Sequence, residues 1–232
     1  MKYWHLMKLG VASLRLVKDP NRLDEVFTML DKLRDTNRTM MQEVADDARQ
    51  TPTGASSLRD LPRIGKIDPA QLVKLPQGTL GRAHAEFLLA RNLDPSALPM
   101  KEAHDEPTYV EAHLYETHDV WHTVTGFQTD VAGELGLQAF YLAQMPGKLP
   151  TALLAVGFLN TLLYAFDDRH RRMDAIIQGY RLGRRSQRLF GMRWAELWTS
   201  PLHEVRRQLG IEPVSALPTP VPSAAASSLV AA

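Results

Sequence analysis

The sequence predicts an all-α protein: a single orthogonal multi-helix domain of about eight helices, followed by a disordered C-terminal tail. Apolar residues recur at helical spacing along most of the 232 residues, and strand-like alternation is essentially absent. Segments rich in proline, glycine and serine separate the periodic stretches. A chain of this length buries roughly 70% of the surface that it exposes when unfolded, which is enough for one core. We therefore place the domain at residues 1–212 and the tail at residues 213–232.

Charge balance and the lack of cysteine exclude several classes of protein. The 27 lysines and arginines nearly equal the 26 acidic residues, so we expect no nucleic-acid partner. Without cysteine there are no disulfides, thiolate metal sites or cysteine nucleophiles, so any metal must be bound by His, Asp and Glu. Charges at His5, Lys8 and Arg15 interrupt the apolar start of the chain. We expect a mature chain without a secretory signal, in a reducing cytoplasm.

The first half predicts helical layers joined by loops. Apolar stripes predict helices over residues 4–17 and from Leu23 onward. The first is expected to pack in the core, although an amphipathic helix can also lie on a membrane surface. Residues 50–69 are rich in Thr, Pro, Gly and Ser without a sustained period, which predicts a loop. Thr79 is placed to cap the next helix, and prolines between residues 95 and 107 mark a second connector.

The second half predicts a helix that begins near Pro107, a segment over residues 133–144, and a long helix over residues 149–172. Apolar residues cover nearly the whole circumference of the last of these, which predicts a buried central helix. Its apolar run, residues 151–166, spans 16 residues, short of the roughly 18 or more of a membrane span. A final amphipathic helix is predicted over residues 194–209. The Pro-, Ser- and Ala-rich end cannot bury enough apolar surface to order itself.

His118, Asp119 and His122 form a cluster of candidate metal ligands on the predicted helix. Residues four apart on a helix differ by only about 40° in direction, so the two histidines can share one ion. Glu134 would lie about 18 Å beyond His122 on an unbroken helix, too far to reach the same ion. Gly126 can end that helix in the left-handed conformation, and Thr129 or Asp130 can cap a returning one. This turn would bring Glu134 back to face the histidines.

Such a ligand set suits zinc, iron(II) or manganese, and its carboxylates tolerate magnesium. Zinc is the metal that we expect first. A pair of histidines four residues apart also occurs in helices without any metal, so the bare hydrogen-bonded pair stays as an alternative. The metalloprotease motif is excluded, because the glutamate that serves as its general base is missing: residues 119–121, between the two histidines, are Asp, Val and Trp.

Two other classes of enzyme fit the sequence poorly. Asp167 and Asp168 are similar to the paired aspartates of isoprenoid synthases, but those enzymes need two such motifs and this chain has one. The adjacent His118 and Asp119 are similar to the pair in histidine–aspartate phosphohydrolases. Those enzymes need further ligands on distant helices, and the surroundings of His84 and His104 do not match.

The cluster as a whole resembles the coenzyme Q (ubiquinone) biosynthesis protein four family. That family's signature is His-Asp-x-x-His, then eleven residues, then Glu, and here it is met by His118, Asp119, His122 and Glu134. The likeness extends to the Leu-Pro-x-Gly-Thr-Leu-Gly-Arg segment at residues 75–82 and covers roughly residues 10–212. One departure is that His113 and Tyr115 stand just before the motif, where family members often carry arginines.

This resemblance implies a helical protein that associates peripherally with membrane and binds a divalent metal through the motif. The implied activity is oxidative decarboxylation at ring carbon one of a prenylated hydroxybenzoate-type intermediate of ubiquinone synthesis. The alternative is a non-catalytic prenyl-lipid scaffold or carrier for the other quinone-biosynthesis enzymes. We expect a bacterial member, cytoplasmic and peripheral to the inner membrane, that forms a homodimer and contacts other proteins of quinone biosynthesis.

The implied substrate assigns further candidate residues. A polyprenyl tail needs an apolar groove, and a carboxylate head group needs cations. Because the metal would occupy the histidines, the candidate proton carriers are Asp119 and Glu116. The candidate groove residues are Phe140, Tyr141, Leu154, Phe158 and Leu162, and the candidate head-group residues are Arg184 and Arg185. The alternative is that the apolar residues are ordinary core and the arginines a solvated helix face.

Overall fold

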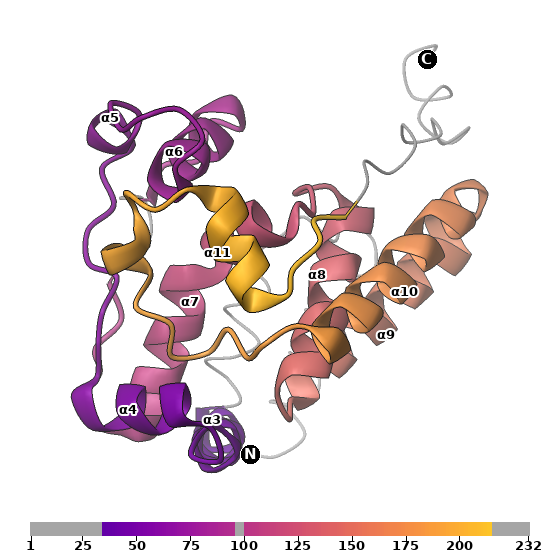
Figure 1. Ribbon diagram of the computed structural model, residues 1–232. Coiled ribbons are helices and arrows are strands. Elements are labelled where there is room, and N and C mark those ends of the chain that lie inside the picture. Colours follow the sequence, from indigo (N-terminus) through magenta and orange to yellow (C-terminus); the bar gives the residue numbers. More distant parts are fainter. Residues whose placement is uncertain (1–33, 96–99, 215–232) are drawn as a thin grey trace.

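A computed structural model describes residues 34–95 and 100–214 of the chain (Figure 1). Within these residues there are nine α-helices and no strand, which confirms the predicted all-α class. The helices are α3 (Arg34–Ala48), α4 (Pro52–Asp60), α5 (Pro69–Leu72), α6 (Leu80–Ala90), α7 (Glu106–Thr125), α8 (Val131–Gln144), α9 (Lys148–Tyr164), α10 (Arg169–Arg185) and α11 (Leu202–Leu209), with 3₁₀ helices η2 (Phe166–Asp168) and η3 (Trp194–Leu197). The helices predicted over residues 4–17 and from Leu23 to Leu30, and the tail from residue 215, lie outside the described residues.

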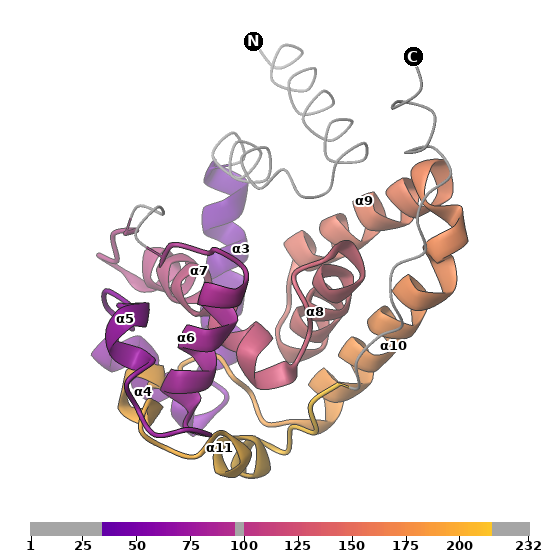
Figure 2. The ribbon, with the colours of Figure 1, turned by 90° about the horizontal axis from the view of Figure 1, so that it is seen from above.

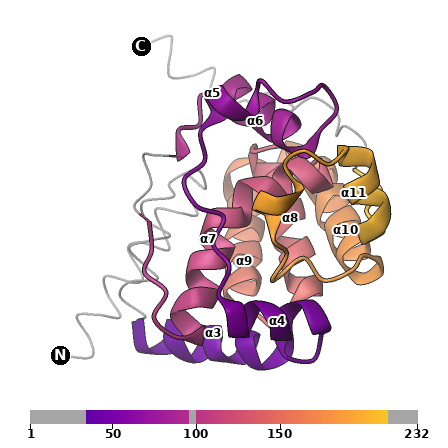
Figure 3. The same ribbon diagram turned by 60° about the vertical axis from the view of Figure 1, so that its left-hand side comes forward.

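Helix α7 lies in the middle of the helical assembly. Figure 3 shows α3 and α4 near one end of α7, and α5 and α6 near the other. Arg38 of α3 pairs with Asp105 at the start of α7, and His84 of α6 bonds Thr123 near its end. Figure 2 shows α8 beside α7, with α9 and α10 diverging from a shared turn on its far side. Both ends of α7 are therefore tied to segments distant in sequence.

The main core forms where α3, α7 and α8 meet the C-terminal segment. Its largest fully buried side chains include Trp121 of α7, Phe140 of α8 and Trp194 of η3. Trp121 stacks on Tyr141 with ring centroids 4.3 Å apart and meets Phe140 edge-on at 5.8 Å. Burying an aromatic side chain removes a large apolar area from water, so these rings hold α7 against α8.

Helices α8 and α10 run side by side in the same direction and approach each other unusually closely. A Cβ atom added at Gly179 of α10 would lie 1.9 Å from the carbonyl oxygen of Gly136 on α8. One turn later, a Cβ atom at Gly183 would lie 2.8 Å from the carbonyl oxygen of Phe140. Only residues without a side chain permit this backbone contact, so the two glycines set the distance between the helices.

The loop predicted over residues 50–69 is wrong in its first half, because α4 occupies Pro52–Asp60. Thr51 accepts a hydrogen bond from the Gly54 amide, and Pro52 stands at the first helical position, where its missing N–H costs nothing. Gly54, Ser57 and Leu58 are buried. Packing and a good N-terminal cap thus override the poor helix propensity of the segment.

The buried central helix predicted over residues 149–172 is also wrong. Helix α9 ends at Tyr164, and only Pro150, Leu154, Gly157 and Asn160 of it are buried. Leu162 is 62% exposed and Leu163 60% exposed. Although α9 has apolar residues on every side, only one of its faces is packed, and another apolar face is exposed to solvent. Among the described residues, no helix is both long and apolar enough to cross a membrane.

The single final helix predicted over residues 194–209 is divided in two. The 3₁₀ helix η3 ends at Leu197, and Pro201 immediately precedes α11. Thr79 and Pro201 form an isolated β-bridge, and the Leu202 amide donates to the Gly78 carbonyl. The residues between η3 and α11 thus attach the C-terminal segment to the start of α6. The predicted cap of α6 is confirmed, since the Thr79 side chain accepts from the Arg82 amide.

Candidate metal centre

Helix α7 is well fixed at both ends. At its start, Asp105 and Thr108 form a capping box, and Pro107 lies in the first turn, as predicted. At its end, Gly126 adopts the left-handed conformation with φ of 87°. Arg206 of α11 donates hydrogen bonds to the carbonyls of Thr123 and Val124 in the last turn. The side chains of this turn are therefore held in place from two directions.

The turn predicted at Gly126 is confirmed, and it returns the chain toward α7. Phe127 is buried directly after the turn, and the Asp130 side chain caps α8 by accepting from the Gly133 amide at 2.9 Å. Glu134 consequently falls in the first turn of α8. The carboxylate that lies twelve residues after His122 in sequence thereby faces it in space.

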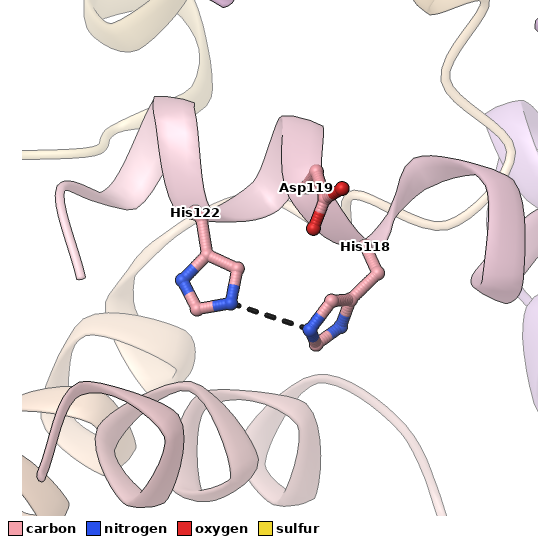
Figure 4. A group of neighbouring side chains, drawn as sticks. All are labelled: His118, Asp119 and His122. Carbon is pink, nitrogen blue, oxygen red and sulfur yellow. Dashed lines mark hydrogen bonds between the residues drawn. The ribbon is translucent and has the colours of Figure 1, made fainter. Parts of the chain in front are cut away.

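The predicted ligands His118, Asp119, His122 and Glu134 are brought together at this corner between α7 and α8. Figure 4 shows the two imidazoles and the Asp119 carboxylate on the same side of α7. The Nε2 atoms of the histidines are 3.2 Å apart. Glu134 places one carboxylate oxygen 3.2 Å from His122 Nε2 and the other 3.7 Å from His118 Nε2. Asp119 has a carboxylate oxygen within 4.8 Å of both histidines.

These separations fit the ligands of one metal ion. Ligand atoms bound about 2.0–2.1 Å from a tetrahedral zinc ion lie roughly 3.3 Å from one another. His122 Nδ1 lies 3.0 Å from the Phe127 carbonyl oxygen, so it carries a proton that it donates to this acceptor. The lone pair available for a metal is then on His122 Nε2, which faces the other ligands. The donors and their spacing therefore suit a divalent cation.

The centre is enclosed on one side and open on the other. The His122 side chain is 0% exposed, whereas those of His118 and Glu134 are each 33% exposed. Phe87 of α6 stacks on His122 with ring centroids 5.7 Å apart. A ligand arriving from solvent would therefore meet His118 and Glu134 first.

Electrostatics at the centre favour a positive charge. Burial alone would lower the pKa of His122, but the charge of Glu134, its hydrogen bond and the Phe127 carbonyl raise that pKa above its usual value. Burial would likewise raise the pKa of Glu134, yet His122 holds it below its ordinary value. Burial and the nearby His122 lower the pKa of His118. When no metal is bound, the positive charge of protonated His122 compensates the negative charge of the Glu134 carboxylate.

A further histidine, His84 of α6, lies next to Asp119. Its Nδ1 is 2.9 Å from Thr123 Oγ1, and that hydroxyl donates to the Asp119 carbonyl. Burial lowers the pKa of His84 to about 4, partly offset by the charge of Asp119. His84 therefore stays neutral, with its Nδ1 proton directed to Thr123.

Glu116, the second candidate proton carrier, is not brought to the cluster. Its carboxylate accepts from Arg63 Nε at 3.1 Å for both oxygens. Two residues along a helix from His118 correspond to about 200° of rotation, which turns the side chain to the opposite face. Glu116 instead joins α7 to the segment after α4.

The candidate groove residues do not form one groove. Phe140 lies in the main core, and Tyr141 is buried between Trp121 and His118. Leu154 packs in a small second cluster with Leu135 and Ala139. Phe158 and Leu162 are exposed on α9.

Arg184 and Arg185 lie at the C-terminal end of α10, beside the end of α8 that is remote from Glu134. Arg184 is exposed, and Arg185 pairs with Glu212 at 3.0 Å. Neither arginine is among the residues that contact the histidines.

Sequence reasoning missed the direct contact of Tyr141 with the cluster. Its hydroxyl lies 3.4 Å from His118 Nδ1, and the two rings stack with centroids 6.0 Å apart. Tyr141 follows Glu134 by seven residues, which places both on one face of a helix two turns apart. That spacing was a readable signal once Glu134 had been placed on a returning helix.

Comparisons with known proteins agree with one another. A family model described as Coenzyme Q (ubiquinone) biosynthesis protein Coq4 matches residues 4–215. The mitochondrial ubiquinone biosynthesis protein COQ4 homolog of Rattus norvegicus is 30% identical over 212 residues, which cover 90% of this chain and 78% of the relative. Its Homo sapiens counterpart is 29% identical over 210 residues, covering 89% and 77%. A solved structure from Nostoc punctiforme PCC 73102, assigned to ubiquinone biosynthesis, matches with a TM-score of 0.75 and 32% identity, covering 88% of this chain and 96% of that chain.

Proposed function

The chain belongs to the coenzyme Q (ubiquinone) biosynthesis protein Coq4 family, and from this membership we propose that it is a metal-dependent enzyme of ubiquinone synthesis. Its substrate is a prenylated hydroxybenzoate-type acid, and its reaction replaces the carboxyl group on ring carbon one with a hydroxyl. The observation that carries the proposal is the convergence of His118, His122 and Glu134, whose donor atoms lie 3.2–3.7 Å apart.

His118, His122 and Glu134 hold a divalent ion, with zinc the first choice for two imidazoles and carboxylate oxygens. When bound, such an ion supplies Lewis acidity and fixes the orientation of the ring carboxylate. Asp119 either completes the ligand set or carries a proton beside it. The exposed sides of His118 and Glu134 leave room for the carboxylate to approach.

The proposed reaction consumes dioxygen and two electrons from a separate donor. The bond between ring carbon one and the carboxyl carbon breaks, carbon dioxide leaves, and a new bond to oxygen forms at the same ring carbon. Dioxygen supplies that oxygen atom, and an external two-electron donor reduces the second atom to water. The residues of the protein orient the acid, while Phe87 and Tyr141 cover the enclosed side of the two histidines.

Because a prenylated acid resides in a membrane, the protein must contact the membrane surface to bind it. The exposed apolar side chains of α9 suit such a contact. The exposed side chains of its C-terminal half, together with that of Phe166, are apolar, and they stand beside basic α10. The members of this exposed apolar face are Phe158, Leu159, Leu162, Leu163, Tyr164 and Phe166. Contiguous exposed apolar surface of this kind marks an interaction site. Exposed arginines of α10, such as Arg169 and Arg181, suit anionic lipid head groups.

The test combines metal analysis with turnover. Purified protein is incubated with a prenylated hydroxybenzoic acid, dioxygen, a reductant and added zinc, manganese or iron(II), beside the Glu134→Gln variant. We expect carbon dioxide release and the hydroxylated product with the native chain, and loss of at least 100-fold in rate with the variant, since it removes one ligand charge. Matched metal content in both proteins, with no turnover in either, would leave the scaffold function and exclude the enzymatic one. A native chain that binds none of these metals would exclude the centre itself.

A further inference from the structure

Arg171 is a buried side chain in the first turn of α10 that joins two carboxylates. Its Nε and one terminal nitrogen donate to the two oxygens of Asp168, at 2.8 and 2.9 Å. The other terminal nitrogen donates to Asp130 at 2.6 Å. The Arg171 side chain is only 8% exposed. One guanidinium thus links the turn between α9 and α10 to the residue that begins α8.

Asp130 occupies a decisive place in the metal centre, although it is not a ligand. The carboxylate oxygen not bound by Arg171 accepts from the Gly133 amide, which caps α8. The Asp130 carbonyl accepts from the Glu134 amide at 2.8 Å. The position of Asp130 therefore sets the first turn of α8, and with it the backbone of Glu134.

Energetics suggest that this arrangement serves geometry more than stability. The cost of removing an arginine and two carboxylates from water offsets much of their mutual attraction. Proteins with apolar residues of similar size in place of such buried ion pairs are often equally stable. Metal centres, in contrast, depend on ligand positions held to about half an ångström, and groups behind the ligands commonly change affinity 10–100-fold. A rigid, doubly hydrogen-bonded guanidinium meets that need.

We propose that Arg171 is a positioning residue of the metal centre, holding Glu134 in ligand geometry through Asp130. The inference rests on the proposed function, because it assumes that Glu134 binds a metal. Figure 2 shows the turn that joins α9 to α10. The inference adds that this turn, which carries part of the exposed apolar face, is connected to the centre through the hydrogen bonds of Arg171 to Asp168 and Asp130.

Arg172 provides a matched control on the same helix. It is equally buried, and it also donates to Asp168, at 3.0 Å. Its remaining bonds go to Asn160 and Thr161 on α9. Arg172 therefore shares the charge, burial and one partner of Arg171, but it does not reach Asp130.

The experiment measures zinc affinity, by competition with a chromophoric chelator, for the native chain and the variants Arg171→Lys and Arg172→Lys. Lysine keeps the charge but has a single nitrogen, so it cannot reproduce the three hydrogen bonds that three Arg171 nitrogens make to Asp168 and Asp130. We expect Arg171→Lys to weaken zinc binding about 10-fold or more and Arg172→Lys to change it less than about 2-fold. Urea unfolding of the same samples should show similar losses of stability for the two variants.

A third variant, Asp130→Asn, protects the test against misfolding of the first. The amide oxygen of asparagine can still cap α8, but asparagine lacks the negative charge that pairs with Arg171. We expect the same loss of zinc affinity, and no additional loss when Asp130→Asn is combined with Arg171→Lys. Equal weakening by Arg171→Lys and Arg172→Lys, or unchanged affinity in Arg171→Lys and Asp130→Asn, would overturn the inference while leaving the proposed function intact. A native chain that binds no zinc, manganese or iron(II) would overturn both.

Discussion

The Tyr141 hydroxyl lies 3.4 Å from Nδ1 of His118, on the edge of the imidazole opposite the nitrogen that faces His122. When Nε2 binds a metal, Nδ1 carries the proton and donates it to this hydroxyl. Burial, together with the charges of Glu134 and Asp119, raises the pKa of Tyr141 well above its usual value, so the hydroxyl stays neutral. We therefore expect Tyr141 to orient the imidazole of His118, a candidate ligand.

Substituting Tyr141→Phe should weaken zinc binding about 10-fold while changing stability by less than about 1 kcal/mol, because the ring still stacks on Trp121. Isothermal titration with zinc measures the affinity. Tyr109→Phe is the control, since its hydroxyl lies the same 3.4 Å from Nδ1 of a different histidine, the buried His113, outside the centre. Equal effects from the two substitutions would count against a role for Tyr141 in metal binding.

Glu116→Gln should leave zinc affinity unchanged. Its carboxylate is engaged by Arg63 on a different face of α7, so neutralising it removes no ligand and no neighbour of a ligand. The same change should reduce the free energy of unfolding by about 1–3 kcal/mol, because it weakens a largely buried charged hydrogen bond. Zinc titration and urea unfolding report the two effects separately. A tenfold loss of zinc affinity in this variant would contradict the prediction and indicate that Glu116 takes part in metal binding.

Much of the candidate metal centre was predictable from the sequence, because the length of a helix limits which residues can meet. An unbroken helix cannot bring Glu134 to His122, and Gly126 followed by Asp130 is a sequence that ends one helix and starts another. The structure has that turn, with Gly126 left-handed and Asp130 as cap. Local rules sufficed because Glu134 lies only sixteen positions after His118.

Contacts between distant segments were not predictable in the same way. A helix with apolar residues on all sides, such as α9, matches the pattern of a buried helix and also that of a helix with an exposed apolar face. Only the helices that pack against it determine which of the two forms. The ties of Arg171 to Asp130 and of Glu116 to Arg63 span 41 and 53 residues, and no periodicity encodes them. Arg184 and Arg185 were assigned to the head group by charge alone, and the fold places them beside the end of α8 that is remote from Glu134.

Gly179→Ala should destabilise the protein by about 3 kcal/mol. The added methyl group would lie 1.9 Å from the Gly136 carbonyl oxygen, and backbone on both sides must move apart to admit it. Gln178→Ala, one position earlier on α10, should change stability by less than about 0.5 kcal/mol. Thermal unfolding of the two variants makes the comparison. Similar melting temperatures would show that α8 and α10 tolerate a wider separation.

The double substitution Leu162→Asn and Leu163→Asn should abolish most binding to vesicles that contain anionic phospholipid. Both side chains are about 60% exposed, so the change removes apolar surface without opening a cavity in the core. Flotation with vesicles of phosphatidylglycerol and phosphatidylcholine measures the binding. Leu154→Ala is the control, because this buried residue of α9 should lower stability by about 2–5 kcal/mol and leave vesicle binding intact. Undiminished flotation of the double variant would exclude the exposed face of α9 as the contact.

Acid should destabilise the protein through His113. Its ring is 2% exposed, and Nε2 accepts from the Gly191 amide at 3.2 Å, so protonation would set two N–H groups against each other. Burial lowers the pKa of His113 to about 4, against 6.5 for an unhindered imidazole. Because the unfolded chain binds the proton more readily, the stability from this residue is complete above pH 6.5. It is lost progressively as the pH falls toward 4.

Between pH 7 and pH 5 the expected loss from His113 is about 2 kcal/mol. Urea unfolding of the native chain at these two pH values should show it, added to the loss from other buried histidines such as His84, whose pKa is also about 4. The His113→Gln variant should be less stable at pH 7, because its shape fits the cavity less well, but its stability should fall by about 2 kcal/mol less between pH 7 and pH 5. Identical pH dependence in the two proteins would mean that folding leaves the pKa of His113 unchanged, which would contradict the prediction.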